Sequence, residues 1–193
     1  METETNTQGE EEMKIALSGS GSTGKTTLAT EVSKKYGVTM IPEFAREVAD
    51  EMGIVKIRDM NSDQAFEFQS RILSKKMELE DSNENFIADR STADNIAYYL
   101  RWCCRDLSDD QNEEYVNRCL SQLRKYDEIF LLPWQSLEIV DDGFRSIKAY
   151  YQYEIHCTII GILRDNDIPY TVIGYNDLRS RVELIGTYFE KVL

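Results

Sequence analysis

The densest run of small and hydroxyl side chains in this 193-residue sequence is LSGSGSTGKTT, at residues 17–27. Within this run, residues 19–26 match the pattern G-x-x-x-x-G-K-[ST] at every position, between an apolar stretch and a predicted helix. Glycines let backbone N–H groups curl around a phosphate, and the N-terminus of the following helix adds unpaired donors. The run therefore predicts a loop that binds the phosphates of a nucleoside triphosphate.

Two side chains of this loop are suited to direct work on the phosphates. Lys25 would reach the β- and γ-phosphates, and the Thr26 hydroxyl would ligate Mg²⁺. The expected cofactors are ATP and Mg²⁺, although the loop pattern does not distinguish ATP from GTP. The residues expected to surround the nucleotide are Gly19, Ser20, Gly21, Ser22, Thr23, Gly24, Lys25, Thr26 and Thr27.

Charged side chains also follow two other apolar stretches. Asp89 ends the stretch NFIAD, and we expect its carboxylate near Mg²⁺ through water, with capping of the next helix as the alternative. Arg90 suits a phosphate or reacting hydroxyl of an acceptor, or else an ion pair with a neighbouring acid. Glu43 follows VTMIP and is the candidate general base; Arg46, one turn later, would share the substrate site. The alternative is a surface pair of Glu43 with Arg46.

Apolar stretches and helical patterns alternate along the chain. The predicted strands are the segments MKIALSG, VTMIP, NFIAD, EIFLLP and PYTVIG, each followed by a helical pattern. Asn61 with Gln64, and Ser91 with Asp94, have the spacing of helix capping boxes. This alternation predicts a three-layer α/β/α domain over residues 13–193, with a five-stranded parallel sheet whose active site lies at the carboxyl ends of its strands.

Composition limits the classes of partner. The chain has 35 acidic and 22 basic residues, and five of the acidic ones lie in residues 1–12, which we expect to form a disordered tail rather than a signal peptide. This balance disfavours general nucleic-acid binding, and no stretch is long and apolar enough to predict a membrane span. The four cysteines form no C-x-x-C pair and His156 is the one histidine, so we expect no zinc site, a structural His156 and a reducing cytoplasm.

Several known classes of phosphate-loop protein lack support. We find no N-K-x-D guanine motif of a GTPase switch. A motor or AAA-type machine would need an apolar strand ending in two acidic residues, whereas the strand here ends in Asp89-Arg90. These comparisons leave the smaller phosphate-transfer enzymes as the better match.

The remaining motifs resemble those of the nucleoside and nucleotide kinases. DRSTADNIAYYL, at residues 89–100, resembles the D-R-Y-x-x-S-N-x-A-Y motif of thymidylate kinases and the E-R-S motif of deoxynucleoside kinases. FEFQ, at residues 66–69, is similar to the F-x-F-Q segment of the latter family. EFAR, DRS and DDGFRS (residues 141–146) together resemble short ATPases related to the ribosylnicotinamide kinase domain of NadR-type proteins. Where those kinases usually have E-P after the second strand, this chain has Pro42-Glu43.

The resemblance implies further roles. Gln69 would read the base of the acceptor, with Phe66 or Phe68 packing beside it or in the core, and Asp94 or Asn95 would contact sugar or base unless Asp94 only caps its helix. A lid near residues 134–148 would carry Arg145, with Lys148 as a weaker partner, to neutralise the transferred phosphoryl group. Arg179 and Arg181 would pack on the adenine. The implied strand order is 2-3-1-4-5.

The expected function is therefore ATP- and Mg²⁺-dependent transfer of the γ-phosphoryl group to a small nucleoside- or nucleotide-like acceptor. On this prediction, the catalytic residues are Lys25, Glu43, Asp89, Arg90 and Arg145. The substrate-binding residues are Glu43, Arg46, Gln69, Arg90 and Asp94, and the metal-binding residues are Thr26 and Asp89. Two alternatives stay open, a non-catalytic ATP- or GTP-binding regulator and a kinase acting on a modified base or end in DNA. The partners would be the small acceptor and a second copy in a homodimer, with no membrane.

Overall fold

The computed structural model describes residues 12–134, 148–174 and 177–191. Nearly all of the predicted acidic tail and of the predicted lid lie outside these residues, as does Arg145. The strands are β1 (Met13–Ser18), β2 (Thr39–Ile41), β3 (Asn85–Asp89), β4 (Glu128–Leu131) and β5 (Thr171–Val172). The helices are α1 (Lys25–Tyr36), α2 (Ala45–Glu51), α3 (Ser62–Asp81), α4 (Thr92–Trp102), α5 (Asp109–Leu123), α6 (Ala149–Asp165) and α7 (Leu178–Phe189), with short 3₁₀ turns η1 (Ile57–Asp59) and η2 (Cys104–Asp106).

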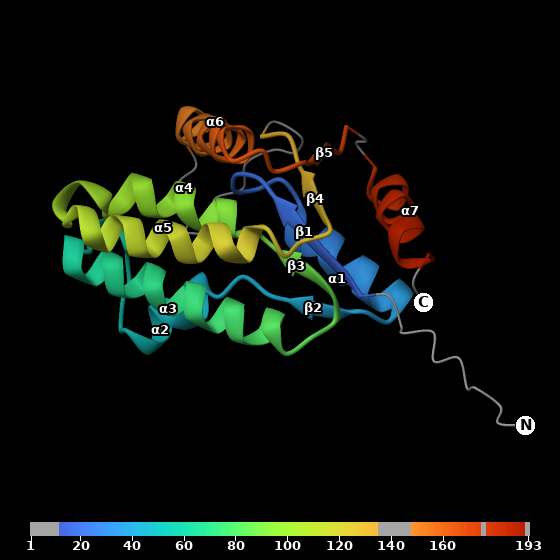
Figure 1. Ribbon diagram of the computed structural model, residues 1–193, viewed down its shortest axis with the longest axis horizontal. Helices are drawn as coiled ribbons and strands as arrows, with labels where there is room; N and C mark the ends of the chain where they lie inside the picture. The colour runs from blue at the N-terminus through green and yellow to red at the C-terminus, as the bar shows by residue number, and fades with distance from the viewer. Residues whose placement is uncertain (1–11, 135–147, 175–176, 192–193) are drawn as a thin grey trace, which may run out of the picture.

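All five strands pair in parallel, in the order β2-β3-β1-β4-β5. The predicted α/β/α class, the five parallel strands and the strand order are thereby confirmed (Figure 1). β1 lies at the centre, with Leu17 level with Asp89 of β3 and with Phe130 of β4. Because these strands run the same way, their carboxyl ends meet at one edge, where the phosphate loop begins.

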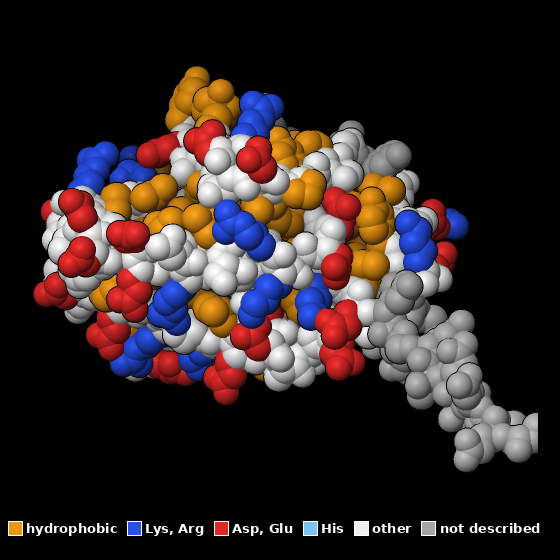
Figure 2. Space-filling view, in the orientation of Figure 1, with side chains coloured by type: hydrophobic (Ala, Val, Ile, Leu, Met, Phe, Trp, Pro, Cys, Tyr) orange, Lys and Arg blue, Asp and Glu red, His pale blue; other side chains and the backbone are white. Residues whose placement is uncertain are grey.

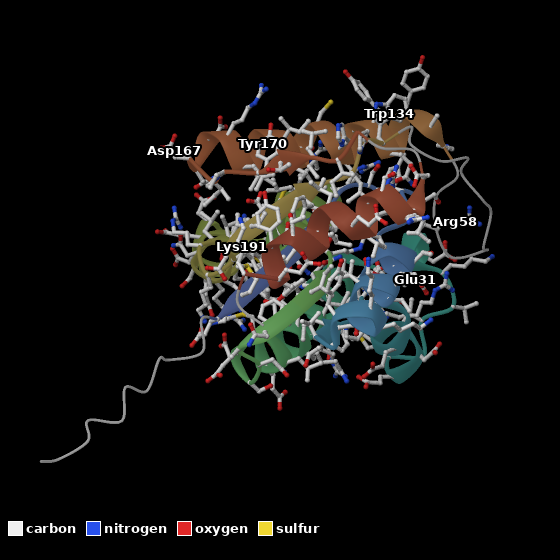
Figure 3. All side chains as sticks on the ribbon, turned by 90° about the vertical axis from the view of Figure 1, so that its right-hand side faces the viewer. Glu31, Arg58, Trp134, Asp167, Tyr170 and Lys191 are labelled. Carbon is white, nitrogen blue, oxygen red and sulfur yellow. The ribbon has the colours of Figure 1, made fainter. Side chains whose placement is uncertain are left out.

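Alternation along β1 separates the two layers of helices. Ile15 and Leu17 belong to a buried cluster with residues of α1 and α7, whereas Ala16 belongs to a cluster with residues of α2 to α6. α1 and α7 lie side by side on the first face (Figure 3), and the other five helices cover the second. A sheet buried on both faces explains why its strands are continuous apolar stretches in the sequence.

The local signals for helix ends are confirmed. Asn61 and Gln64 form a capping box at the start of α3, and Ser91 and Asp94 form one at the start of α4. Gly37 ends α1 with φ of 70°. The second box fixes where α4 begins, immediately beyond Asp89 and Arg90.

The described surface carries charges of both signs. On the face seen in Figure 2, basic side chains lie interspersed with acidic ones rather than in one block. Among the described helices, none combines the length and the hydropathy needed to cross a bilayer.

Candidate active site

The loop between β1 and α1 has the backbone that its glycines predict. Gly19 has φ of 141° and Gly24 has φ of 85°, and Ser22 also has a positive φ, of 58°. A Cβ on Gly19 would lie 2.7 Å from the carbonyl oxygen of Leu132, so only glycine fits there. Positive φ values at these positions are compatible with the curled backbone of an anion-binding loop.

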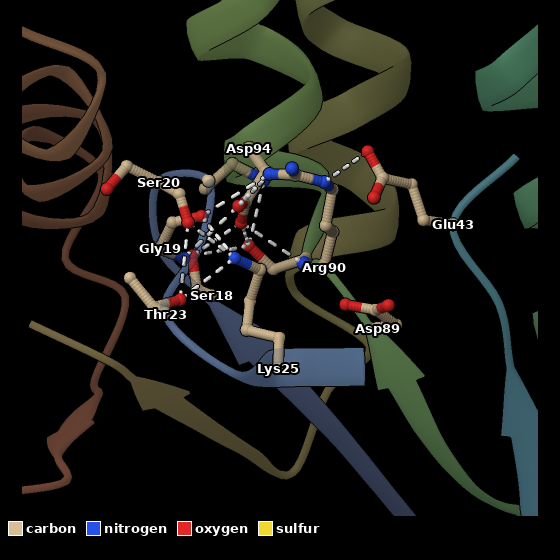
Figure 4. A network of polar contacts seen from close by, with 12 residues as sticks. Ser18, Gly19, Ser20, Thr23, Lys25, Glu43, Asp89, Arg90 and Asp94 are labelled. Carbon is tan, nitrogen blue, oxygen red and sulfur yellow. Dashed lines mark hydrogen bonds and ion pairs between the residues drawn. The ribbon is translucent and has the colours of Figure 1, made fainter. Parts of the chain in front are cut away.

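Lys25 lies under this loop and contacts its carbonyl groups (Figure 4). The ammonium group donates to the carbonyl oxygens of Gly19 (2.8 Å) and Ser20 (2.6 Å) and to Oγ1 of Thr23 (3.1 Å). The residue is only 5% exposed, and burial, followed by the positive charge of Arg90, lowers the pKa of Lys25 to about 8. A phosphate that enters the loop would supply the negative charge that these neutral partners lack.

Thr26 and Asp89 provide oxygen atoms suited to a magnesium ion. The Thr26 hydroxyl donates to Oδ2 of Asp89 at 2.5 Å. Asp89 is buried, and its Oδ1 has no hydrogen-bond partner among the described residues. Since buried carboxylate oxygens are normally paired, this unpaired atom fits the prediction of a bound cation. The described residues contain no cluster of three or more His, Cys, Asp or Glu side chains, so Mg²⁺ would keep waters and phosphate oxygens as its other ligands.

Arg90 extends over the start of the loop from the junction between β3 and α4. Its Nε lies 2.8 Å from Oε1 of Glu43 in an ion pair, and its Nη1 lies 3.1 Å from Oδ1 of Asp94 and 3.3 Å from the carbonyl oxygen of Gly19 (Figure 4). The guanidinium also lies 4.9 Å from the ring centre of Tyr98. Burial lowers the pKa of Arg90, but Glu43 and the other anionic neighbours outweigh that effect and raise it well above its ordinary value. The predicted ion pair with a neighbouring acid is therefore present, and it brings the candidate base to the loop.

Asp94 connects the loop to α4 rather than facing an open space. Its carboxylate accepts hydrogen bonds from Oγ of Ser18 (2.6 Å), from the N–H of Gly19 (3.1 Å) and from both the N–H and the hydroxyl of Ser91. The residue has no exposed surface. The capping alternative is thus present, and contact with a sugar or base stays a prediction.

Other predicted acceptor residues lie on α2 and α3. Arg46 is exposed in the first turn of α2, and Gln69 is buried on α3. Phe68 is buried in the core, while Phe66 packs edge-to-face on Tyr99 with ring centres 6.4 Å apart. Both phenylalanines therefore contribute to packing, as the sequence allowed for at least one of them.

The two arginines assigned to the adenine have different surroundings. The Arg179 side chain is 87% exposed and pairs with Glu183. Arg181 is 3% exposed, and its Nη1 donates to the carbonyl oxygen of Thr23 at 3.3 Å. Arg181 thus supports the loop from behind, which its position in the sequence did not indicate, while adenine packing stays a prediction for either residue.

Gln152 is a site residue that sequence reasoning missed. It lies on α6, is buried, and its Oε1 accepts the N–H of Gly21 at 2.7 Å. The available signal was a polar residue on the buried face of a largely apolar helix, a position that requires a hydrogen-bond partner. No local motif identified the loop as that partner.

A family model described as an AAA domain matches residues 14–181. In the sequence, the apolar strand is followed by Asp89-Arg90 rather than by two acidic residues, and this argued against an AAA-type machine. The family match shows that the absence of an acidic pair does not exclude a family described as an AAA domain. A search of curated proteins found no match.

Solved structures of similar fold include a NadR protein in complex with NR, with TM-score 0.69 and 17% identity over 93% of this chain and 52% of that chain. A deoxyadenosine kinase from M. mycoides with bound dATP has TM-score 0.61 and 21% identity, over 92% of this chain and 100% of that one. Thymidylate kinase from Candida albicans has TM-score 0.65 and 18% identity, over 93% and 92%. The chain spans about half the length of the NadR protein. At these identities the similarity establishes the fold, which is that of the resembled kinases.

Proposed function

We propose that this chain, which belongs to a family described as an AAA domain, is an ATP- and Mg²⁺-dependent kinase. It would transfer the γ-phosphoryl group to a small nucleoside- or nucleotide-like acceptor. The observation that carries the proposal is the position of Arg90, whose guanidinium lies 3.3 Å from the Gly19 carbonyl of the phosphate loop and 2.8 Å from Glu43. A group suited to an acceptor and a candidate base therefore adjoin the place where a γ-phosphate would lie.

Different residues of the site would bind the nucleotide, bind the acceptor and accept its proton. The loop amides and Lys25 would hold the β- and γ-phosphates, while Arg90 would hold the acceptor. The attacking oxygen of the acceptor forms a bond to the γ-phosphorus as the bond to the β–γ bridging oxygen breaks, and ADP leaves. For a hydroxyl acceptor, the released proton would pass to Glu43. Because the transition state is loose, positioning matters more than the strength of this base.

Thr26 and Asp89 would hold Mg²⁺, which neutralises charge on the transferred group. Gln69 and Arg46 would contact the acceptor, and Arg145, outside the described residues, would act on the transferred phosphoryl group. The acceptor class is supported by the sequence resemblance and by similar structures that are described as deoxyadenosine kinase and thymidylate kinase.

The decisive experiment is an acceptor screen with Mg-ATP, read out as ADP release. The panel contains nucleosides, nucleoside monophosphates, vitamin ribosides such as nicotinamide riboside, and a short oligonucleotide. We expect turnover with one class of small acceptor, and loss of that turnover in Lys25→Met. Tight nucleotide binding with no turnover on any acceptor would favour the regulatory alternative. Turnover on the oligonucleotide alone would favour the DNA-directed one.

A further inference from the structure

Lys76 is a buried cation that belongs to none of the motifs described above. It lies on α3, and its side chain is 3% exposed. Its ammonium group donates to the backbone carbonyl oxygen of Arg90 at 2.7 Å and pairs with Oε1 of Glu80 at 2.7 Å. The charge of Lys76 is therefore used inside the protein, on the main chain of the residue that adjoins the phosphate loop.

Glu80 is itself held by two further donors. Its Oε1 accepts from the hydroxyl of Tyr126 at 2.8 Å, and its Oε2 accepts from Nε2 of Gln122 at 2.9 Å. Burial, and then the Glu80 carboxylate, raise the pKa of Tyr126 well above its ordinary value, so this phenol remains a donor. Glu80 and Gln122 are also buried. The ammonium position is thus set by a carboxylate whose own position is set from α5 and the turn that follows it.

Such a network is a poor source of net stability. Removing two charges from water is expensive, and a buried ion pair is often no more stabilising than apolar residues of the same size. A buried pair that ends on a single carbonyl group points instead to control of conformation at that carbonyl. Arg90 is where such control is needed.

The backbone of Arg90 has φ of 88°, in a region that side chains other than glycine rarely adopt. Strain of this kind persists only where the surroundings hold the residue in place. The Arg90 guanidinium contacts the carbonyl of Gly19 and the carboxylate of Asp94, while Lys76 holds the Arg90 carbonyl. Side chain and carbonyl are therefore both restrained.

We propose that Lys76 is a positioning residue that holds Arg90 in its left-handed backbone conformation through the Arg90 carbonyl. Hydrogen bonds from Tyr126 and Gln122 fix the position of the Glu80 carboxylate, which fixes the position of the Lys76 ammonium group. The ammonium group then fixes the orientation of the Arg90 carbonyl, and this backbone conformation directs the guanidinium toward Glu43 and the loop. The kinetic consequence rests on the proposed function, because it is measured as phosphoryl transfer. The structural consequence does not.

The test replaces the buried pair without leaving a lone charge, in the double variant Lys76→Met with Glu80→Gln. The matched control is Lys75→Met, the adjacent lysine on α3, which is partly exposed and bridges Glu47 and Glu51 at 2.6 and 2.7 Å. We expect the double variant to lose about 10- to 100-fold in kcat through misplacement of Arg90. Its dissociation constant for ADP, measured by calorimetry, should stay within about threefold, because the contacts of Lys76 and Glu80 are with Arg90, Tyr126 and Gln122 and leave Lys25 in place. The control should match the wild type in both.

A crystal structure of the double variant provides a readout that needs no activity. We expect Arg90 to leave the positive-φ region and its guanidinium to move away from Glu43. An unchanged Arg90 together with an unchanged kcat would overturn the proposal. So would an altered KM for the acceptor with Arg90 in place, since that result would make Lys76 a substrate contact. If the wild type phosphorylates nothing, the proposed function fails, while the conformation of Arg90 still decides the role of Lys76.

Tyr126→Phe covers the case in which the double variant does not fold. It removes one hydroxyl and leaves the ion pair intact, so the restraint should loosen rather than disappear. A fall in kcat of about threefold with unchanged ADP affinity is expected, in keeping with the loss of one hydrogen bond. A Tyr126→Phe enzyme with wild-type kcat and an unmoved Lys76 would overturn the linkage through Glu80.

Discussion

Lys25 of the phosphate loop and Arg90 of the junction between β3 and α4 are both buried cations, and they are partnered in opposite ways. Lys25 donates to neutral oxygens of Gly19, Ser20 and Thr23. Arg90 lies against two carboxylates, those of Glu43 and Asp94. The first cation donates directly to neutral oxygens, whereas the second pairs directly with carboxylates.

Because of this difference, we expect Lys25 and Arg90 to respond differently to a bound phosphate. An incoming phosphate would give Lys25 a partner stronger than the carbonyl groups it leaves, so charge neutralisation would favour binding. In order to move, Arg90 would have to part from the buried carboxylate of Asp94 and the partly exposed one of Glu43, which is unfavourable. We infer that the loop responds to the nucleotide, while the junction acts as a fixed reference for the acceptor. The predictions below test that division, beginning with the largest effect.

Lys25→Met should reduce phosphoryl transfer by about 10³-fold or more, because the γ-phosphate loses a preorganised charge. It should also weaken nucleotide binding, since the same charge supports the ground state. Initial rates of ADP release and calorimetric titration with ADP measure the two effects. The control is Lys34→Met, on the same helix, whose exposed side chain pairs with Glu31. Wild-type activity in Lys25→Met would contradict the role of the loop.

Arg90→Lys should lower kcat by about 10²-fold while leaving nucleotide affinity within about threefold, because the charge remains but the planar fork is lost. Glu43→Gln should lower kcat by about tenfold with similar nucleotide affinity, since a loose transition state needs little assistance from a general base. Steady-state kinetics and ADP titration separate kcat from binding. If nucleotide affinity falls in step with kcat, the two regions form one unit and the division fails.

Nucleotide affinity should depend on pH through Lys25. With its pKa at about 8, this lysine is charged below that value and loses its proton above it. The dissociation constant for ADP should therefore be level below about pH 7.5 and should rise by up to about tenfold per unit above pH 8. Titration of Lys25→Met over the same range is the control, and it should show no such rise. A flat wild-type profile up to pH 10 would mean that Lys25 keeps its proton in the free protein.

The lowered pKa of Lys25 also makes the free energy of unfolding depend on pH. The unfolded chain binds more protons than the folded chain between the lowered pKa of Lys25 and its ordinary value of 10.5. The contribution of Lys25 to the free energy of unfolding should therefore increase with pH over that interval. Comparing urea unfolding of the wild type and Lys25→Met at pH 7.5 and 9.5 isolates this contribution.

Arg181→Met should destabilise the protein by about 1–2 kcal/mol, because the Thr23 carbonyl loses a charged donor in a buried position. Arg179→Met is the matched control two residues away, and its exposed pair with Glu183 should contribute nothing measurable. Urea unfolding followed by circular dichroism compares them. Equal stability of both variants would show that the contact behind the loop is unimportant.

The phosphate loop and the fold class could be predicted from sequence because their signals are local. Residues 19–26 are consecutive, so one pattern specifies the turn, the donors and the start of α1. The capping boxes of Asn61 and Ser91 depend on spacings of three residues. The alternation of apolar stretches and helical patterns can also be recognised without knowledge of contacts, because a sheet buried on both faces requires apolar strands between its helices.

The partners of the buried charges could not be predicted in this way. Gln152 meets Gly21 across 131 positions, and Arg181 meets Thr23 across 158. Arg179 and Arg181 are two residues apart in the sequence, yet α7 exposes the first and buries the second. Lys75 and Lys76 differ in the same way on α3. The residue types thus specify what chemistry is available, and the packing of helices against a common sheet selects which charge reaches the loop, because hydrogen bonds and ion pairs act only over a few ångströms.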